Sequence, residues 1–296
     1  MWTPVRRKRR PTWLVAYALL APALVLMVPF QVYPVLEAVW LSLHRVSLTR
    51  LHAPQFVGLD NYLRIARYQD PDFVPTVLAN TARFVSGSLL LQMGLGLLLA
   101  LLVHQTWVRG RPVFRSIYLI PWVTTGVIAA YSWRFIYDPR TGILNHLVVR
   151  AGGAPQSWLA DPRLSMGSLI LANTWKGTAF SFLVQTAGLQ SIDPELYDAA
   201  RVDGASGWQA TLYVTLPLLR PFLLINLIIA SLHTLNVFDL IYVTTGGGPL
   251  FSTEVMSLFM YHLAFEWGQL GLGAAVATVI LALSLALTLL YVRALR

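Results

Sequence analysis

Cysteine is absent from this chain of 296 residues, and charge is scarce. Only 12% of the residues are Asp, Glu, Lys or Arg, against about a quarter in a typical soluble domain. The absence of cysteine excludes disulfides, thiolate metal ligands and a cysteine nucleophile. The low charge and the 56% of hydrophobic residues favour a protein surrounded by lipid, because a soluble fold of this length could not hide several separate apolar runs.

Sequence signatures of enzymes are also missing. No Gly-x-x-x-x-Gly-Lys-Ser/Thr loop occurs, and the run Lys176-Gly177-Thr178 has a different order within an apolar stretch. There is no His-Glu-x-x-His motif, no Gly-x-Ser-x-Gly elbow and no close pair of carboxylates in an apolar stretch. The glycines at 246–248 lack a following Lys-Ser or Lys-Thr, so they favour a flexible turn over a phosphate site. We therefore expect no catalytic residue, no metal site and no cofactor in this chain.

Six stretches are long and apolar enough to cross a bilayer. Backbone groups in lipid need internal partners, which favours helix throughout. Prolines within these stretches predict kinks or local unwinding, at Pro22, Pro29, Pro34 and Pro121. The expected fold class is an all-α membrane protein with six transmembrane helices. The predicted spans are 13–41, 84–103, 114–137, 165–189, 218–244 and 270–292.

The distribution of basic residues predicts that both chain ends are cytoplasmic. The basic run 6–10 precedes the first span, where anionic lipid and the positive-inside bias favour it on the cytoplasmic side. The outer loops carry their arginines over longer stretches, and the third outer loop has none. Residues 1–12 therefore form a basic cytoplasmic N-terminus. We interpret the first span as an uncleaved anchor rather than an export signal, because its apolar run continues to Val39. This bias accounts for the net charge of +9, and no nucleic-acid partner is expected.

The loop at 190–217, between the fourth and fifth predicted spans, predicts a short helix. Asp193 can accept hydrogen bonds from free amides, Pro194 suits the first helical position, and Glu195 places negative charge at the positive end of the dipole. Gly204 permits a turn that residues with a Cβ resist. One face of this helix contains two alanines, which would let another chain approach closely. That face consists of Leu196, Ala199, Ala200 and Asp203. Capping alone is equally compatible with an ordinary helix between two spans.

The same loop resembles the Glu-Ala-Ala loop of ABC importer permeases. Asp198-Ala199-Ala200 is followed after three residues by Gly204, and after nine more by Val214-Thr215-Leu216-Pro217. In that family the loop is a coupling helix that sits in a groove of a separate cytoplasmic ATPase. The resemblance implies this role for Glu195, Asp198, Ala199, Ala200, Asp203 and Gly204. Two positions depart from the pattern, since Asp198 stands where Glu is usual and Thr211 where an aromatic residue is common. The charge at position 198 is retained on a shorter arm, so docking is expected to survive.

Further motifs resemble the maltose and trehalose type branch of sugar permeases, in order along nearly the whole chain. They are Phe56-Val57-Gly58-Leu59-Asp60-Asn61-Tyr62, Asn80-Thr81, Trp175-Lys176-Gly177-Thr178 and Gly246-Gly247-Gly248-Pro249. The resemblance implies a type I ABC importer permease fold, with 1–296 as one multi-pass domain in the inner membrane of a prokaryote. It also implies three partners: a second, related permease, an ATPase dimer that binds ATP and Mg, and an extracytoplasmic substrate-binding protein. Alternating access driven by the ATPase is the expected mechanism.

Polar side chains in the fourth and fifth spans mark a candidate substrate pathway. Such groups are costly at membrane depth unless they face a cavity or a partner, and sugars are recognised by aromatic faces and hydrogen-bonding groups in a cleft. In the fifth span, polar residues recur near helical spacing, and Asn236 matches the family's substrate-lining stretch. The candidates are Trp175, Lys176, Gln185, His233, Asn236, Asp239 and Tyr242, with Asn173 beside them.

An ion pair between Lys176 and Asp239, shaping a closed external gate, is a further hypothesis. The alternative for Lys176 is a bond to backbone carbonyls or an extended side chain that reaches the membrane surface. His233 taken alone is equally compatible with a satisfied interior histidine.

The expected cargo is a disaccharide or oligosaccharide. An importer of glycerol phosphodiesters or a phosphorylated polyol would share the fold and is an alternative. An ion-coupled carrier working alone is a second alternative, but such carriers often show two repeated halves, and none is seen here.

Overall fold

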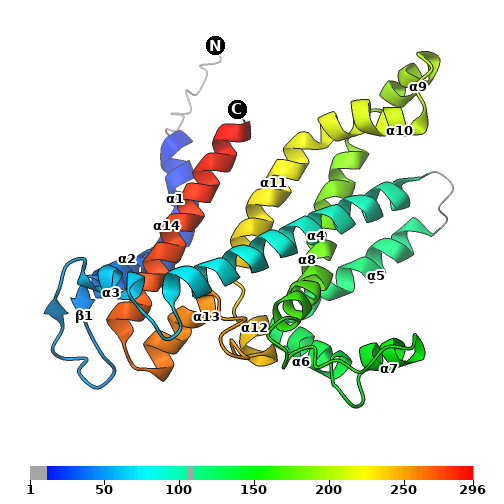
Figure 1. Ribbon diagram of the computed structural model, residues 1–296. Coiled ribbons are helices and arrows are strands. Elements are labelled where there is room, and N and C mark those ends of the chain that lie inside the picture. Colours follow the sequence, from blue (N-terminus) through cyan, green and yellow to red (C-terminus); the bar gives the residue numbers. More distant parts are fainter. Residues whose placement is uncertain (1–11, 106–109, 296) are drawn as a thin grey trace, which may run out of the picture.

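The computed structural model describes residues 12–105 and 110–295 (Figure 1). The basic run at 6–10 and Arg109 lie outside the described residues. The described chain is mostly helical and contains a two-stranded antiparallel sheet, in which His44 lies opposite Phe56. In chain order the elements, with η for π-helical segments, are α1 (Thr12–Met27), η1 (Val28–Val32), α2 (Tyr33–Ser42), β1 (His44–Arg45), β2 (Gln55–Phe56), α3 (Asp60–Ala66), η2 (Phe73–Leu78), α4 (Ala79–His104), α5 (Arg111–Val123), α6 (Gly126–Ile136), α7 (Ile143–Arg150), α8 (Ser165–Gln190), α9 (Pro194–Val202), α10 (Gly207–Ala210), η3 (Thr211–Thr215), α11 (Leu216–Leu235), α12 (Asp239–Thr244), α13 (Met256–Tyr261), η4 (His262–Glu266) and α14 (Leu270–Leu295).

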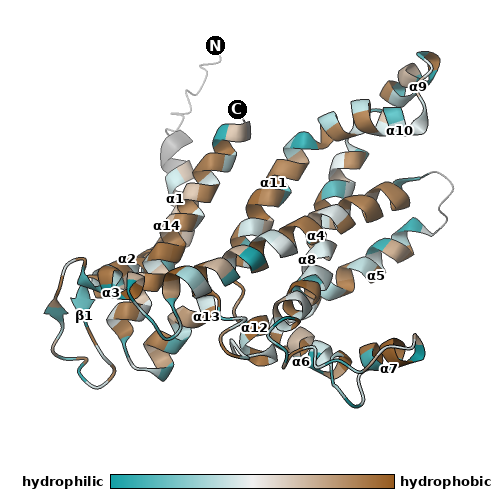
Figure 2. Ribbon diagram, viewed as in Figure 1, coloured by the Kyte–Doolittle hydropathy of each residue, from teal (hydrophilic) through white to brown (hydrophobic). Residues whose placement is uncertain are grey.

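Four helical segments of the described chain are long and apolar enough to cross a bilayer. They are Ala16–Ser42, Phe73–His104, Gly207–Leu235 and Leu270–Ala294. The ribbons of these helices are coloured mostly as hydrophobic along their length, whereas hydrophilic residues recur in the β hairpin and the loops (Figure 2). The first of them contains the unwinding that the prolines predicted, because its helical path widens into the π-helical turn Val28–Val32.

The third predicted span is bent rather than continuous. Helices α5 and α6 meet at an angle of 98°. Thr124 and Thr125 both adopt extended backbone conformations there, and the Thr125 hydroxyl caps α6 by accepting a hydrogen bond from the Ile128 amide at 3.4 Å. The sequence predicted one span over 114–137 with a kink or local unwinding at Pro121. The break lies instead at Thr124 and Thr125, because a side-chain cap starts a new helix inside the apolar run.

Helix α8 differs from the other long helices in composition. It has 26 residues, which at 1.5 Å each exceeds the roughly 30 Å of a bilayer core. It is nevertheless too polar to qualify as a span by hydropathy among the described residues. Half of its side chains are buried, and many of these are polar. The polarity has a physical reason, since one side of α8 packs against its neighbours α4, α5 and α11, where the buried polar side chains meet protein.

The fifth predicted span, 218–244, ends earlier than expected. Helix α11 stops at Leu235, and α12 begins only at Asp239. Asn236 lies between them and donates from its amide nitrogen to the Leu232 carbonyl at 2.8 Å, which helps to close the end of α11. The spacing of the polar residues in this segment predicted that they share one continuous helical face. Because the helix breaks between α11 and α12, they do not.

Glycines allow α4 and α8 to cross at close range. A Cβ added to Gly96 would stand 2.6 Å from the Ser181 Cβ, and one added to Gly177 would overlap the Gln92 side chain. Small residues at such crossings let two backbones approach and gain dispersion contacts. The α4–α8 pair is the most extensive helix–helix contact of the fold, and it forms one wall of the cavity described below.

The two ends of the molecule differ in character. Helix α9 projects from one end, where the first described turn of α1 and the last turn of α14 also lie (Figure 1). The β hairpin, α3, α6, α7 and α13 gather at the opposite end. The chain thus places its capped loop helix and both of its terminal helix ends on the same side.

Candidate functional site

A cavity of about 780 Å³ lies between the middle of α8 and the end of α11. Its walls come from α4, α5, α8, α11 and the start of α12. One wall carries an aromatic pair, Trp122 and Phe180, with ring centroids 6.2 Å apart. The lining residues are Gln92, Trp122, Asn173, Lys176, Gly177, Phe180, Ile229, Ala230, Leu232, His233, Thr234, Asn236, Val237, Asp239 and Leu240. A cavity of this kind, mostly apolar with a few convergent polar groups, is the usual form of a small-molecule site.

Four of the seven predicted pathway residues line this cavity. They are Lys176 from α8, His233 from α11, Asn236 from the break and Asp239 from the start of α12. Asn173, named beside them, also lines it, and its side-chain nitrogen is buried without a hydrogen-bond partner among the described residues. That amide nitrogen is enclosed beside the cavity and has no acceptor in the described part of the chain.

The other three predicted pathway residues do not line the cavity. Trp175 makes an edge contact with the ring of Trp133, and Gln185 is fully buried and donates to the Met93 carbonyl at 3.3 Å. Tyr242 stacks on Phe238, with centroids 5.2 Å apart. The break after α11 changes the phase of the following residues, which is why Tyr242 leaves the face that helical spacing had assigned to it.

Lys176 and Asp239 share the cavity without an ion pair within 4.0 Å. Asp239 instead accepts the Leu240 amide at 2.8 Å through Oδ1. Its other carboxylate oxygen lies where a Cβ on Gly126 would be, so glycine is needed beside it. The predicted pair is thus not made in this structure, although both charges face one space. The cavity carries one lysine and one aspartate, and their formal charges cancel.

Sequence reasoning missed several cavity residues, among them Gln92, Trp122 and Phe180. Gln92 donates to the Asn173 carbonyl at 3.2 Å across the α4–α8 crossing. Its signal was available, because it is an uncharged polar residue in the middle of the apolar run 84–103. Trp122 and Phe180 gave no comparable signal, since aromatic residues in apolar spans are common.

The loop helix α9 forms as predicted, over Pro194–Val202. Asp193 accepts the Glu195 amide at 3.0 Å, and Gly204 closes the helix with a φ of +81°. A capping box between Ser206 and Gln209 then starts α10. Local sequence signals alone were sufficient here, because each cap acts within four residues.

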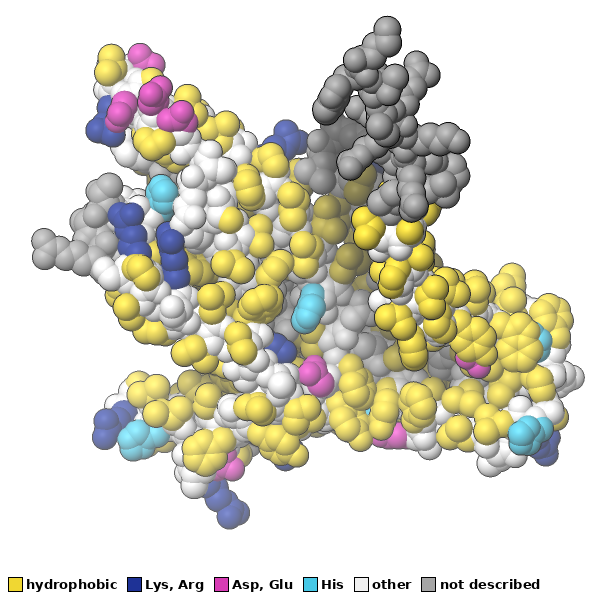
Figure 3. Space-filling view, turned by 180° about the vertical axis from the view of Figure 1, so that it is seen from behind, with side chains coloured by type: hydrophobic (Ala, Val, Ile, Leu, Met, Phe, Trp, Pro, Cys, Tyr) yellow, Lys and Arg dark blue, Asp and Glu magenta, His cyan; other side chains and the backbone are white. Residues whose placement is uncertain are grey.

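Helix α9 presents most of its surface to solvent. None of its residues is buried, and the predicted coupling residues Glu195, Asp198, Ala199, Asp203 and Gly204 are exposed, with Ala200 half-buried. Acidic side chains gather at this tip of the molecule (Figure 3). Asp198 forms an exposed ion pair with Arg201. Large apolar side chains are also exposed, including Val202 at 88% and Trp208 at 73%. An acidic and apolar tip of this kind is typical of a surface that meets another protein.

Comparisons with known proteins assign this chain to a family. A sequence profile described as "binding-protein-dependent transport system inner membrane component" matches residues 92–295. The chain belongs to this family. The permease is 37% identical over 277 residues to the trehalose/maltose transport system permease protein MalF of Thermococcus litoralis, covering 94% of this chain and 92% of the relative. The predicted family is therefore confirmed.

Solved structures agree with the family assignment. The permease superposes with a TM-score of 0.81 and 26% identity on a chain of a bacterial ABC transporter involved in the import of the acidic polysaccharide alginate, covering 96% and 95% of the two chains. A second structure shows the bacterial alginate transporter in complex with alginate pentasaccharide-bound periplasmic protein, with a TM-score of 0.80, 25% identity and coverage of 94% and 92%. The protein is thus a helical, multi-pass permease of the ABC importer type, with the type I fold. No cluster of three or more His, Asp or Glu side chains suited to a metal occurs in the described ranges.

Proposed function

We propose that the permease conducts a neutral disaccharide or oligosaccharide through the cavity between α8 and α11. The observation that carries this proposal is the combination of the Trp122–Phe180 pair with polar lining groups, including His233 and Asn236, in one cavity. A pyranose ring presents an apolar face that packs on aromatic rings, and its hydroxyls need hydrogen-bonding partners in a partly dry site. The trehalose/maltose relative and the alginate transporter agree with a sugar as the cargo.

The charge of the cavity favours a neutral sugar over the phosphorylated alternative. Lys176 and Asp239 contribute opposite formal charges to the lining. A site built for a phosphate ester would need an excess of Lys or Arg, because an anion in a partly dry cavity is costly without paired charge. The glycerol phosphodiester alternative therefore lacks a matching feature in this cavity.

Six membrane crossings follow when α8 is counted as a span and α5 with α6 as a bent one. The length of α8 and its position among α4, α5 and α11 support this count. We place α9 and both terminal helix ends in the cytoplasm, because they lie at one end of the molecule and the basic residues favour that side. Residues 1–296 then form one transmembrane domain in the inner membrane of a prokaryote, with lipid around its apolar helices.

Helix α9 couples this bundle to an ATPase that this chain does not contain. The exposed face with Glu195, Asp198, Ala199, Ala200, Asp203 and Gly204 docks on one subunit of an ATPase dimer, which binds ATP and Mg. Closure of the dimer on nucleotide moves α9 and opens the cavity outward, and hydrolysis returns it inward. The shift requires nucleotide to bind the closed dimer more tightly than the open one. A second permease completes the pathway, and a substrate-binding protein delivers the sugar from outside.

The decisive experiment is uptake by the complete transporter reconstituted into proteoliposomes. Labelled trehalose and maltose, with glycerol 3-phosphate as the competing class, are supplied with the transporter's own binding protein and internal ATP. We expect sugar uptake, and a loss of roughly 2- to 13-fold for Trp122→Ala from stacking alone, because stacking contributes about 0.5–1.5 kcal/mol beyond the buried area of a large aromatic side chain. Uptake of glycerol 3-phosphate and not of sugars would refute the proposal.

The coupling role of α9 has a matched pair of variants. A Cβ at Gly204 or at Gly207 meets nothing within 4 Å, but only Gly204 has a positive φ. A β-branched residue is strongly disfavoured in that conformation, so Gly204→Val should distort the end of α9 and Gly207→Val should not. The loaded binding protein stimulates ATP hydrolysis by the transporter. We expect this stimulated rate to fall in Gly204→Val and to stay near the unmodified level in Gly207→Val. Equal stimulation in both would contradict the coupling role, and Asp198→Arg provides an independent test by reversing its charge.

A further inference from the structure

A pocket of about 620 Å³ lies beside helix α9, where the ends of α4, α5 and α8 meet. We call it the inner pocket. The last turn of α4 contributes His104, the first residue of α5 is Arg111, and Gln190 ends α8. Helix α9 adds Tyr197 and Arg201 to the lining. The inner pocket thus joins the ends of three helices to the helix that carries the predicted ATPase-coupling residues.

The lining of the inner pocket is basic. Arg111, Arg201 and His104 belong to it, and no Asp or Glu does in the described part of the chain. Asp198, the exposed partner of Arg201, is outside the lining. Figure 3 shows basic side chains and a histidine just below the acidic tip formed by α9. An anion is therefore the ligand that this pocket favours.

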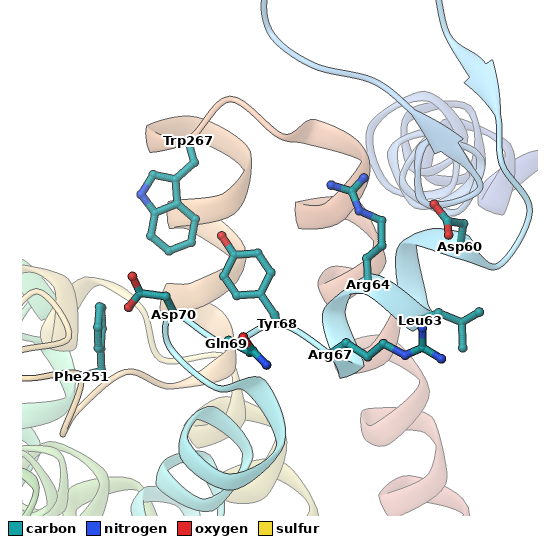
Figure 4. A pocket seen from close by; sticks show the side chains of 9 residues that line it. All are labelled: Asp60, Leu63, Arg64, Arg67, Tyr68, Gln69, Asp70, Phe251 and Trp267. Atoms are coloured by element: carbon teal, nitrogen blue, oxygen red, sulfur yellow. The ribbon is translucent and has the colours of Figure 1, made fainter.

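A pocket of about 730 Å³ at the opposite end of the molecule provides a contrast (Figure 4). Its lining holds two arginines, Arg64 and Arg67, and two carboxylates, Asp60 and Asp70. The formal charges of that lining cancel, as they do in the cavity between α8 and α11. Neither of these two sites has the excess of basic side chains that the inner pocket has.

Two arginines at the start of α5 are held by neutral groups. Arg111 donates from Nη2 to the Gln105 carbonyl at 2.6 Å. Arg115 follows one helical turn later, and in the amide orientation that satisfies both side chains the Gln190 oxygen accepts from its two terminal nitrogens at 2.9 and 2.6 Å. The Nε atoms of both arginines are buried without a partner, and neither side chain forms an ion pair, among the described residues. A guanidinium without a counter-charge at the edge of an apolar bundle is costly unless an anion pairs with it.

The inner pocket and the expected ATPase-docking surface use different faces of α9. Pro194, Tyr197 and Arg201 line the pocket, and their spacing of three and four residues puts them on one face of the helix. Glu195 and Ala199, which belong to the predicted coupling set, are out of phase with these three and lie toward the other side. An ATPase docked on the coupling residues therefore leaves the pocket face of α9 turned toward the helix bundle.

Apolar side chains continue from the inner pocket to the outside of the bundle. Leu101 and Leu189 line the pocket. Next to the lining on α4 and α5, Leu102 and Val113 are exposed at 45% and 62%. A free anion would use only the basic groups, whereas a molecule with an anionic head and apolar tails matches both features. Basic pockets between membrane helices on the cytoplasmic side typically bind the head groups of anionic lipids.

We propose that the inner pocket binds the phosphate head group of an anionic phospholipid. Arg111 pairs with the phosphate, Arg115 adds a second positive charge close by, and His104 offers a hydrogen bond. The acyl chains lie along the exposed apolar side chains of α4 and α5. This inference rests on the proposed function only for the placement of α9 at the cytoplasmic membrane surface, and it adds a ligand that the transport cycle does not name.

A lipid in the inner pocket has a consequence for coupling. Tyr197 and Arg201 of α9 share the lining with the ends of α4 and α8. A bound head group therefore braces α9 against the membrane bundle, and filling of the site should strengthen the transmission of movement between the ATPase and the spans. The rate of ATP hydrolysis stimulated by the binding protein should then depend on anionic lipid.

The test uses the complete transporter in nanodiscs of phosphatidylcholine, with and without added phosphatidylglycerol. Arg111→Gln removes the central charge of the site. Arg293→Gln is the matched control, because it removes one exposed arginine from the last turn of α14, outside the pocket and at the same end of the molecule. Native mass spectrometry measures the affinity of the tightest-bound phosphatidylglycerol. ATP hydrolysis is measured with the sugar-loaded binding protein, and inorganic phosphate is added to pure phosphatidylcholine nanodiscs as a separate arm.

The proposal predicts a loss that is specific to the pocket. Arg111→Gln should weaken the tightest-bound phosphatidylglycerol by roughly 10- to 100-fold, because hydrogen bonds between charged groups are the strong ones, and Arg293→Gln should stay within about twofold. Phosphatidylglycerol should raise the stimulated hydrolysis rate roughly fivefold in the unmodified transporter and in Arg293→Gln, but not in Arg111→Gln. In phosphatidylcholine alone all three should hydrolyse ATP at the same rate, which shows that the variants are folded.

Three results would overturn the proposal. The first is equal retention of phosphatidylglycerol by the two variants, or hydrolysis in the unmodified transporter that does not respond to this lipid. The second is stimulation by inorganic phosphate in pure phosphatidylcholine, because a free anion would then be the ligand. The third is a loss of hydrolysis in Arg111→Gln without phosphatidylglycerol, which would assign the pocket to ATPase docking. The lipid measurement does not depend on sugar uptake, so a failure of the proposed function is recorded separately.

Discussion

The crossing of α4 and α8 can be tested by a single methyl group. We predict that Gly96→Ala destabilises the permease relative to Gly94→Ala, two residues away on the same helix. A Cβ at Gly96 would lie 2.6 Å from the Ser181 Cβ and 3.0 Å from the Phe182 amide nitrogen, whereas one at Gly94 would meet nothing within 4 Å. Ordinary carbon–carbon contacts are about 3.5–4.0 Å. The α8 backbone must therefore retreat by about 1 Å, because its main-chain atoms cannot rotate away.

The magnitude follows from two opposing effects. Overpacking of this kind costs about 1–3 kcal/mol. Replacing a helical glycine by alanine returns up to about 1 kcal/mol through helix propensity, and that gain is common to both variants. The difference between the variants is therefore the strain alone, about 1–3 kcal/mol in the free energy of unfolding.

The assay is SDS-induced unfolding in mixed micelles, followed by the fluorescence of the ten tryptophans. The unfolding midpoint of Gly96→Ala should lie at an SDS concentration equal to or lower than that of the unmodified permease. The midpoint of Gly94→Ala should lie at an equal or higher SDS concentration. The double variant G96A/S181G removes the Ser181 Cβ that the new methyl group would contact, so it should recover part of the lost free energy of unfolding. The recovered part measures the coupling between positions 96 and 181 directly. If Gly96→Ala proved as stable as Gly94→Ala, the close crossing of α4 and α8 would be refuted.

Two further predictions concern regions outside the membrane-spanning helices. Asp193→Ala removes the cap on the Glu195 amide and should cost about 0.5–2 kcal/mol of local helix stability, seen as faster amide exchange in α9 but not in α11; equal exchange would argue against the cap. Burial raises the pKa of Glu254; burial alone would lower that of His262, but its hydrogen bond to Glu254 and the charges of Glu254 and Glu266 raise it overall. Because both pKa values are raised in the folded state, protonation of each group stabilises the fold, so thermal stability should fall as pH rises above about 4.5, the ordinary pKa of a glutamate, and fall further above about 6.5, the ordinary pKa of a histidine. His262→Gln should flatten this decline, and an unchanged pH profile would contradict the assignment.

The sequence predicted which polar residues lie within the candidate site, but only in part where each of them lies in the folded chain. Lys176, His233, Asn236 and Asp239 were identified because polar groups at membrane depth are expensive, and that rule applies at any position in a span. Tyr242 was assigned to the same face because the rule was combined with helical spacing, which requires an unbroken helix, and the structure breaks the helix before it. Asn236 ends the helix, and the phase of every later residue changes with it.

The sequence by itself determined the features that act over one helical turn or one bilayer thickness. Long apolar runs specified membrane helices, and Asp193, Pro194 and Gly204 specified α9, because hydropathy and capping are local energies. Only the tertiary structure decided which side chains meet. The 98° bend after Val123, the cavity shared by Trp122 and Phe180, and the separation of Lys176 from Asp239 all depend on how distant helices pack. Such contacts are set by the shapes of both partners at once, and no single stretch of sequence contains both.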